Sequence, residues 1–163
     1  MINELILRRG LMGANSGGVD WATIGHGMVD AVTPFAIPAG ELPIFTSIAD
    51  KAYFLVNRPN LIGIDFEGQT YIPERICQNC GLTTLTLPAT ISKTGNYCFY
   101  GNTQLTEVIS LNTTPPILGT GIFSACGALT SIYVPDASVD AYKSASQWST
   151  YASIIKPISQ RPT

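Results

Sequence analysis

The four cysteines are the residues whose type and spacing first suggest chemistry. They are Cys77, Cys80, Cys98 and Cys126, and the first two form one C-x-x-C pair. A pair of this kind is typical of zinc sites and of redox-active disulfides. A zinc site needs four ligands that converge at about 2.3 Å from one ion. Whether these thiols converge depends on the elements that carry them.

His26 and the pair of Asp65 and Glu67 are the other candidates for catalysis. His26 is the only histidine, and it lies in a G-H-G sequence where a loop is expected and no acid or nucleophile is recognisably partnered with it. Asp65 and Glu67 alternate on the outward side of an expected strand, which raises the possibility of glycoside cleavage. No supporting pattern surrounds them, and no G-x-S-x-G, P-loop, H-E-x-x-H or G-x-G-x-x-G sequence occurs. We therefore predict no catalytic residue and no cofactor, and we interpret the two carboxylates as a solvated face.

Composition limits the fold and the partners. The 163 residues suffice for one compact domain with tails. Apolar residues make up 45% of the chain and charged residues only 12%, roughly half the usual share of about 25%, so Ser and Thr must supply the surface polarity.

The net charge of −2 offers no basic field for phosphates, so no nucleic acid partner is expected. No window approaches about 20 apolar residues and the first residues lack a secretion-signal pattern, so we expect neither membrane insertion nor export of the chain on its own.

A repeated pattern predicts the architecture. Four segments align, and the leucine that they share recurs 21, 23 and 24 residues apart, at Leu61, Leu82, Leu105 and Leu129. One large apolar residue lies six positions before each leucine, and another apolar residue lies three positions after it. The position three before the leucine is a turn site, where a small polar side chain can bond to the backbone of the bend. It is filled in order by Arg58, Asn79, Asn102 and Cys126.

Alternation after each leucine predicts one short strand per repeat, as in Leu85 and Leu87 with Thr86 between them. Equivalent strands separated by a full coil run in the same direction, so they stack as a parallel sheet about 4.8 Å apart. One coil cannot bury its apolar face alone, so its neighbours must complete the core. We therefore expect a mainly β fold: a short solenoid with a parallel sheet and a short helical C-terminal cap. The predicted repeat core consists of Leu55, Leu61, Ile64, Ile76, Leu82, Leu85, Phe99, Leu105, Val108, Phe123, Leu129, Ile132 and, in the cap, Trp148.

The same register places the cysteines at different positions. Cys126 occupies the turn site, Cys80 follows that site by one residue, Cys77 follows the apolar anchor, and Cys98 precedes its own anchor. Thiols that point in different directions from three coils are poorly placed to share an ion, so we predict no metal site. A bridge between Cys77 and Cys80 would be strained in a tight turn. Buried free thiols are therefore expected.

The unit F-x-x-C-x-x-L-x-x-I-x-V-P at Phe123 to Pro135 resembles the BspA-like leucine-rich repeats that are common in bacteria of the Bacteroides group. The copy that begins at Phe99, with Asn102 in place of cysteine, fits nearly as well. The tail from Thr114 to Ile158 looks like the terminal cap of many such proteins. The resemblance covers roughly residues 45 to 158 and implies a protein that binds or builds rather than catalyses.

The residues of the cap support this interpretation. A helix is predicted from the spacing of Val139, Tyr142, Ala145 and Trp148. Asp136 or Ser138 would be its N-cap. A closing strand is predicted near Ile154, Ile155 and Ile158, where Lys156 and Pro157 discourage further pairing.

Four parts of the chain are expected. Residues 1–18 form an arm with a glycine-rich linker, and residues 19–47 form strands and turns that either cap the solenoid or provide a dimer surface. Residues 48–135 form the solenoid, and residues 136–163 form the helical cap and tail. The arm is either a frayed terminus or a docking peptide for a larger assembly. The anchoring residues would be Leu5, Ile6, Leu7, Arg8 and Arg9.

Two functional hypotheses follow. The first is a virion structural protein of a bacteriophage that infects Bacteroides-type bacteria, a head or tail fibre or decoration subunit; the resemblance implies it, because such phages carry similar repeat modules. The arm would bind a capsid or tail protein, while the solenoid, as a homo-oligomer, contacts host glycans or surface proteins. The second is an adhesin or protein-binding module on the bacterial cell surface. An enzyme is left only if the first third of the chain contains a site.

Overall fold

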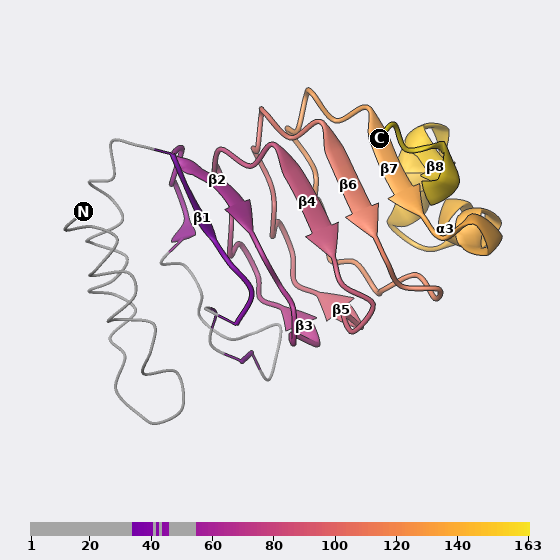
Figure 1. Ribbon diagram of the computed structural model, residues 1–163, viewed down its shortest axis with the longest axis horizontal. Helices are drawn as coiled ribbons and strands as arrows, with labels where there is room; N and C mark the ends of the chain where they lie inside the picture. Colours follow the sequence, from indigo (N-terminus) through magenta and orange to yellow (C-terminus); the bar gives the residue numbers. More distant parts are fainter. Residues whose placement is uncertain (1–33, 41, 43, 46–54) are drawn as a thin grey trace.

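Short strands separated by tight turns make up most of the chain, as the alternating pattern predicts. The computed structural model describes residues 34–40, 42, 44, 45 and 55–163. In Figure 1 they form successive coils that stack along one axis, from β1 at one end to β8 at the other. The expected mainly β solenoid with a parallel sheet and a short helical C-terminal cap is confirmed. The predicted arm and linker (residues 1–18) and His26 lie outside the described residues.

The main sheet has four parallel strands in the order β4, β6, β7, β8. Their bounds are Thr84–Leu87 for β4, Glu107–Ser110 for β6, Ser131–Val134 for β7 and Ile155–Pro157 for β8. The residues that pair in register across the four strands include Leu85, Val108, Ile132 and Ile155. Side chains alternate between the two faces of a strand, so this register brings equivalent apolar residues together on the inner face, where all four are buried.

The stack continues toward the N-terminus with β1 (Phe35–Ile37) and β2 (Leu61–Ile64), which form a separate parallel pair. The described part of the segment 19–47 thus adds one more strand before the first repeat. A backbone hydrogen bond of 3.0 Å from Gly81 N to Leu61 O joins β2 to the coil of β4. The two sheets are therefore parts of one stack.

A second strip of parallel pairing runs along another side of the coils. β3 (Tyr71–Ile72) pairs with β5 (Lys93–Thr94), and Lys93 forms a further parallel bridge with Ile117. In Figure 1 this strip lies below the main sheet. The sequence pattern predicted one strand per repeat, and this expectation is wrong. Each central coil instead pairs with its neighbours on two sides, which satisfies more of its backbone groups.

Two bends hold a residue in the left-handed conformation in the described coils. At the first bend φ is 56° for Arg75, 54° for Tyr97 and 63° for Gly121. At the second bend φ is 58° for Asn57, 54° for Asn79, 73° for Gly101 and 60° for Ala125. This conformation costs a residue other than glycine roughly 1–2 kcal/mol. Asn and Gly fill four of these seven positions and favour this conformation locally. Arg75, Tyr97 and Ala125 do not, so at these three positions the stacking of the coils determines the bend.

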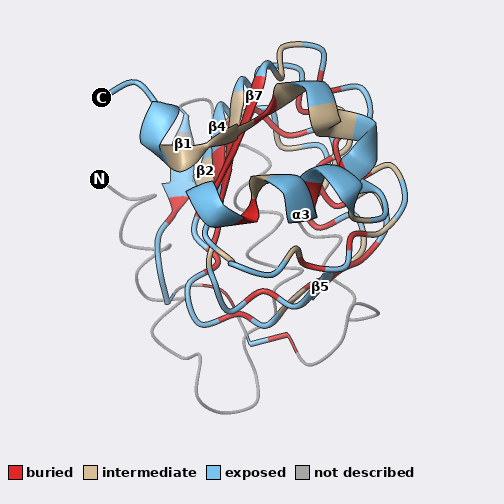
Figure 2. Ribbon diagram, turned by 90° about the vertical axis from the view of Figure 1, so that its right-hand side faces the viewer, coloured by how far each residue is buried: buried red, intermediate tan, exposed pale blue. Residues whose placement is uncertain are grey.

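Apolar side chains fill the space between the sheet and the bends. Four aromatic rings follow one another through the interior, with centroid distances of 5.8, 6.0 and 5.6 Å, in the order Phe66, Phe99, Phe123 and Tyr151. Each buried side chain of this size stabilises the fold by roughly 1.5–3 kcal/mol. Figure 2, which looks along the stack, shows buried residues concentrated on the strands. The interior is continuous from coil to coil.

The C-terminal cap differs in detail from the single helix predicted for it. A short 3-10 turn, η2 (Asp136–Ser138), precedes α3 (Val139–Ser144), and Trp148 begins a separate 3-10 helix, η3 (Trp148–Ile154). α3 stops because Ala145 is extended, with ψ of 146°. Trp148 is fully buried and its Nε1 donates to Pro116 O at 2.9 Å, so it covers the last coil from outside α3.

Ser138, one of the two predicted N-cap residues, is the N-cap of α3, but its side chain does not cap the helix. Ser138 Oγ donates to Thr113 O at 2.8 Å, and Asp136 Oδ1 accepts from Ser159 N at 3.1 Å. Both side chains bind distant backbone in place of the start of α3, which has no side-chain cap. The predicted closing strand is confirmed as β8, which pairs with β7. Within the part of the chain that the structure describes, no helix has the length and hydrophobicity needed to cross a membrane.

Candidate functional site

The residues of the predicted repeat core lie in one interior. Leu61, Leu82 and Leu105 are fully buried, and Leu129 is partly buried and packs against the same cluster. The cluster also contains Leu55, Ile64, Ile76, Leu85, Phe99, Val108, Phe123, Ile132 and Trp148. These side chains are apolar and enclosed, so they serve as a scaffold. Any function must come from the groups that the scaffold presents.

The second coil departs from the alignment expected from sequence. Backbone hydrogen bonds run from Cys77 N to Cys98 O and from Phe99 N to Ile122 O. In a parallel stack these bonds place Cys77 level with Phe99. Cys77 therefore occupies the anchor position that we assigned to Ile76, and Ile76 lies one position earlier. Both side chains are fully buried, so hydrophobicity alone did not distinguish the two alignments.

A shorter bend causes this shift. The left-handed residue Asn79 precedes Leu82 by three positions, whereas the equivalent Gly101 precedes Leu105 by four. The shorter path brings Gly81 against the preceding coil, where an added Cβ would lie 2.0 Å from a backbone oxygen. Only glycine fits at this position. β2 and β4 belong to separate sheets.

With the corrected register, Cys80, Asn102 and Cys126 share one position and one role. The side chain of each donates a hydrogen bond to the backbone of the preceding coil. The acceptors are the carbonyl oxygens of Leu55, Cys77 and Phe99, at 3.0, 2.8 and 3.2 Å respectively. The expectation that Cys80 and Cys126 differ in register is therefore wrong. Arg58 occupies the same position in the first repeat, where its Nη1 donates to Val56 O at 3.2 Å.

The four cysteines are free and buried, as expected. Burial raises the pKa of Cys98 to about 12 and also raises the pKa values of Cys77 and Cys126. The pKa of Cys80 is lowered by a hydrogen bond from Cys77, against the effect of burial. Thiols that stay protonated, as those of Cys77, Cys98 and Cys126 do, are neither nucleophiles nor metal ligands. Among the described residues, no three His, Cys, Asp or Glu side chains are grouped to hold a metal ion.

The structure corrects the placement of the acidic pair. β2 ends at Ile64, so Asp65 and Glu67 lie in the turn that follows it, and both are exposed. Asp65 Oδ1 accepts a hydrogen bond from Glu67 N at 2.8 Å, which stabilises the turn. Two carboxyl groups that act in glycoside cleavage must face each other across a substrate. This local turn does not provide that arrangement.

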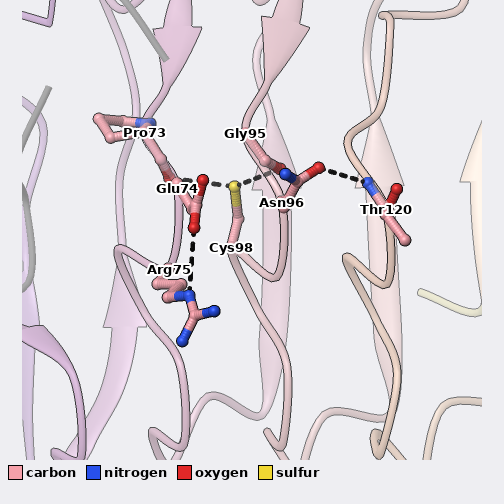
Figure 3. Close-up of polar contacts among 7 residues, drawn as sticks. All are labelled: Pro73, Glu74, Arg75, Gly95, Asn96, Cys98 and Thr120. Atoms are coloured by element: carbon pink, nitrogen blue, oxygen red, sulfur yellow. Dashed lines mark hydrogen bonds and ion pairs between the residues drawn. The ribbon is translucent and has the colours of Figure 1, made fainter. Parts of the chain in front are cut away.

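The bends carry a row of polar side chains, shown in Figure 3. Asn96 Oδ1 accepts from Thr120 N in the next coil at 2.9 Å. Glu74 and Arg75 form an exposed ion pair at 3.2 Å, which contributes little to stability. Between them and Asn96, Cys98 Sγ donates to two backbone carbonyl oxygens, each at 3.0 Å. These groups mainly join one coil to the next.

Exposed threonines follow the entrance to the main sheet. Thr83, Thr106 and Thr130 occupy equivalent positions in three successive coils, and all are exposed. Thr106 Oγ1 donates to Thr83 O at 3.2 Å, and Thr130 Oγ1 donates to Thr106 O at 3.4 Å. Thr84 and Thr86 add exposed hydroxyl groups on the outward face of β4. The solenoid thus presents neutral hydrogen-bonding groups at a regular spacing.

Sequence reasoning missed a buried polar contact between the cap and the last coils. Ser110 Oγ and Tyr142 OH lie 2.8 Å apart, and Tyr142 OH donates to Asn112 O at 2.7 Å. Burial raises the pKa of Tyr142. Ser110 stands at the inward position that Leu87 occupies in β4. A polar residue at a core position of the repeat was the available signal.

Comparison with known proteins agrees with this geometry. The family model for the BspA type leucine rich repeat region (6 copies) matches residues 43–155, well over half of the chain. No curated protein matches the sequence. The matched residues include β2, β4, β6 and β7 and the bends between them. Repeat domains of this kind are generally non-catalytic binding modules. The chain belongs to the BspA-type leucine-rich repeat family.

Proposed function

We propose that this protein is a non-catalytic structural subunit of a bacteriophage virion, a head or tail fibre or decoration protein with an adhesion-type repeat domain. The general character of a binding or adhesion module follows from its repeat family. The location on a virion is the specific part of the proposal. It is supported by the neutral surface of the solenoid and by the composition of the N-terminal arm.

The exposed threonine row is the observation on which the proposal chiefly depends. Thr83, Thr106 and Thr130 offer hydroxyl groups at the spacing of the coils, and Glu107, which follows Thr106, is neutralised by its ion pair with Arg161. A matching partner is itself neutral and rich in hydroxyl or amide groups, such as a glycan or protein of the host surface. Individual contacts of this kind are weak, and many copies on one particle would bind together with high avidity.

The N-terminal arm supplies the attachment in this proposal. The apolar residues Leu5, Ile6 and Leu7 and the basic residues Arg8 and Arg9 precede a glycine-rich stretch. A short apolar segment on a tether can add a strand to a larger protein or lie in its groove. The arm would thus hold the subunit, as a homo-oligomer, on a capsid or tail protein while the solenoid projects outward.

Mass spectrometry of purified phage particles tests the location. We expect the chain in the particles at the stoichiometry of a structural subunit. Protease treatment of intact, uninfected bacteria provides the comparison, because it releases proteins from the cell surface. Absence from particles together with recovery from the cell surface would replace the virion proposal with that of a bacterial adhesin.

Deletion of Met1 to Gly18 tests the role of the arm. We expect a folded, monodisperse solenoid that no longer assembles with particles. A matched control removes only residues 13–18, which shortens the linker and keeps the arm residues. If the deletion of Met1 to Gly18 prevents folding, the arm belongs to the core. If that variant folds and still assembles with particles, attachment occurs elsewhere.

A further inference from the structure

Ile109 and Tyr133 are buried although they point away from the interior. They alternate along β6 and β7 with Val108 and Ile132, which belong to the core cluster, so their side chains leave the opposite face of the sheet. Their exposed fractions are only 9% and 5%, and neither belongs to the core cluster. Thr86, which is in register with Ile109 on β4, is exposed. The outward face is therefore covered over β6 and β7 but open over β4.

Lys156 of β8 and the C-terminal tail both lie over this part of the face: Lys156 is in register with Tyr133, and its Nζ donates to Ser131 Oγ at 2.9 Å. After β8, the 3-10 turn η4 (Ile158–Gln160) leads to Arg161, whose Nε donates to Glu107 Oε1 at 3.0 Å. Nη2 of Arg161 forms an ion pair with the same oxygen at 2.9 Å. Glu107 lies on β6, and β7 lies between β6 and β8, so the tail crosses β7. Arg161 also lies near enough to Tyr133 to interact with it electrostatically. Figure 2 shows the C-terminal turn and α3 on opposite sides of the strands.

The covered surface has a defined chemistry. Its floor is the apolar pair Ile109 and Tyr133, and the carboxylate of Glu107, with a side chain 18% exposed, lies at one end. At the other end, Asp136 Oδ1 accepts from the backbone N of Ser159. A segment that forms a similar turn therefore fits if it carries an arginine for Glu107 and an unblocked backbone N–H for Asp136.

Few contacts hold the tail in place. Arg161 has a side chain 44% exposed, and ion pairs at such exposure contribute little because water competes for both partners. Residues 159–163 are themselves exposed, and terminal segments with few buried contacts open more readily than the core. The tail can thus leave the sheet while the coils stay folded.

We propose that Ile158 to Arg161 form an internal competitor that occupies a docking surface on β6 and β7, and that the external partner is a peptide segment carrying an arginine. The chemistry of the partner is that of the tail itself: a guanidinium on Glu107 and a backbone N–H on Asp136, over the apolar floor. Partner and tail exclude each other, so binding requires release of the tail. This inference goes beyond the virion proposal and does not depend on where the protein is located.

The test uses a fluorescently labelled peptide of sequence PISQRPT, which corresponds to residues 157–163. Fluorescence anisotropy measures its binding to the full chain, to the full chain with Arg161→Ala, and to a chain that ends at Ile158. We expect the shortened chain to bind at least tenfold more tightly than the full chain, with Arg161→Ala between them. If the shortened chain fails to fold, the comparison of Arg161→Ala with the full chain still decides the matter.

Two controls locate the binding. Glu107→Gln in the shortened chain is expected to weaken binding at least tenfold, whereas Ile62→Ala, exposed on β2 on the far side of β4, is expected to leave it unchanged. A peptide with alanine in place of its arginine should not bind. Equal binding by the full and shortened chains, or binding that is indifferent to Glu107→Gln, would overturn the proposal. These outcomes are independent of whether the chain is found in virions.

Discussion

Asn102 joins three backbone groups of two coils with one buried amide. Its Nδ2 donates to Cys77 O and Phe99 O, both at 2.8 Å, and its Oδ1 accepts from Leu82 N at 3.2 Å. We expect Asn102→Ala to lower the free energy of unfolding by about 3 kcal/mol, because these backbone groups lose their partner in the interior. Asn102→Cys restores one of the three bonds, through the weaker donor that Cys80 uses at the same position, so it should cost less than Asn102→Ala. Urea unfolding measures both; equal losses would contradict this account.

Close approach of the coils makes individual glycines sensitive to a single methyl group. An added Cβ at Gly95 would lie 2.5 Å from Glu74 N, so backbone would have to move, whereas at Gly127 it would meet nothing within 4 Å. We expect Gly95→Ala to cost about 2 kcal/mol or more, and Gly127→Ala to change stability by less than about 0.5 kcal/mol. The difference should appear as a lower thermal unfolding midpoint for Gly95→Ala alone. Similar midpoints for the two variants would show that the coils adapt to the extra atom.

At the scale of the element, the four residues of β4 alternate between exposed and buried side chains. Leu85 is 2% exposed and lies in register with Val108, while the adjacent Thr86 faces outward. We expect Leu85→Ala to lower the free energy of unfolding by about 2–5 kcal/mol, because it leaves a cavity between coils. Thr86→Ala, the matched control, should stay within about 0.5 kcal/mol. A loss below about 1 kcal/mol for Leu85→Ala in chemical denaturation would contradict its packing in the column.

The residues of the last strand, β8, prevent a further strand from pairing with it. Pro157 in β8 pairs with Val134 and cannot donate a backbone hydrogen bond to a further strand. Lys156 Nζ instead donates to Ser131 Oγ at 2.9 Å on β7. Edge strands with proline and lysine resist pairing with other chains. β8 therefore closes the stack, and the predicted role of these two residues agrees with their positions.

At the scale of the whole molecule, buried thiols make stability depend on alkaline pH. Burial raises the pKa of Cys98 from 9.0 to about 12 and raises that of Cys77 as well. The folded chain therefore keeps protons that the unfolded chain releases above about pH 9, so the stability present below that pH is lost as the pH rises toward 12. The expected slope for each such thiol is about 1.4 kcal/mol per pH unit.

Urea titrations between about pH 7 and pH 10.5 measure this loss as a fall in the free energy of unfolding above about pH 9. The Cys98→Ala variant starts from a lower stability because it leaves a small cavity. Its alkaline slope should nevertheless be shallower than that of the unaltered chain, because one titrating thiol is gone. Identical slopes would mean that the thiol of Cys98 does not contribute to the pH dependence.

Periodicity in the chain was sufficient to predict the stacked coils, the parallel main sheet, the buried leucines and the closing strand. The physical reason is that apolar residues recurring about every 21 to 24 positions can be buried only if successive coils lie against each other. Leu82 and Leu105 illustrate this, because they occupy equivalent positions in successive coils, and a stack of coils that buries one side chain also buries the other. The repeat pattern in the sequence is therefore sufficient to predict the stacked fold.

Contacts between distant residues determined the rest. Ile76 and Cys77 are both buried, so only the hydrogen bonds to the next coil decide which of them aligns with Phe99. Ser138 has the residue type of a helix cap, yet its hydroxyl binds Thr113, 25 residues earlier. Arg161 donates a hydrogen bond to Glu107, which lies 54 residues earlier in the chain, and thereby covers part of the sheet. A short window of sequence contains none of these partners, because folding alone brings them together.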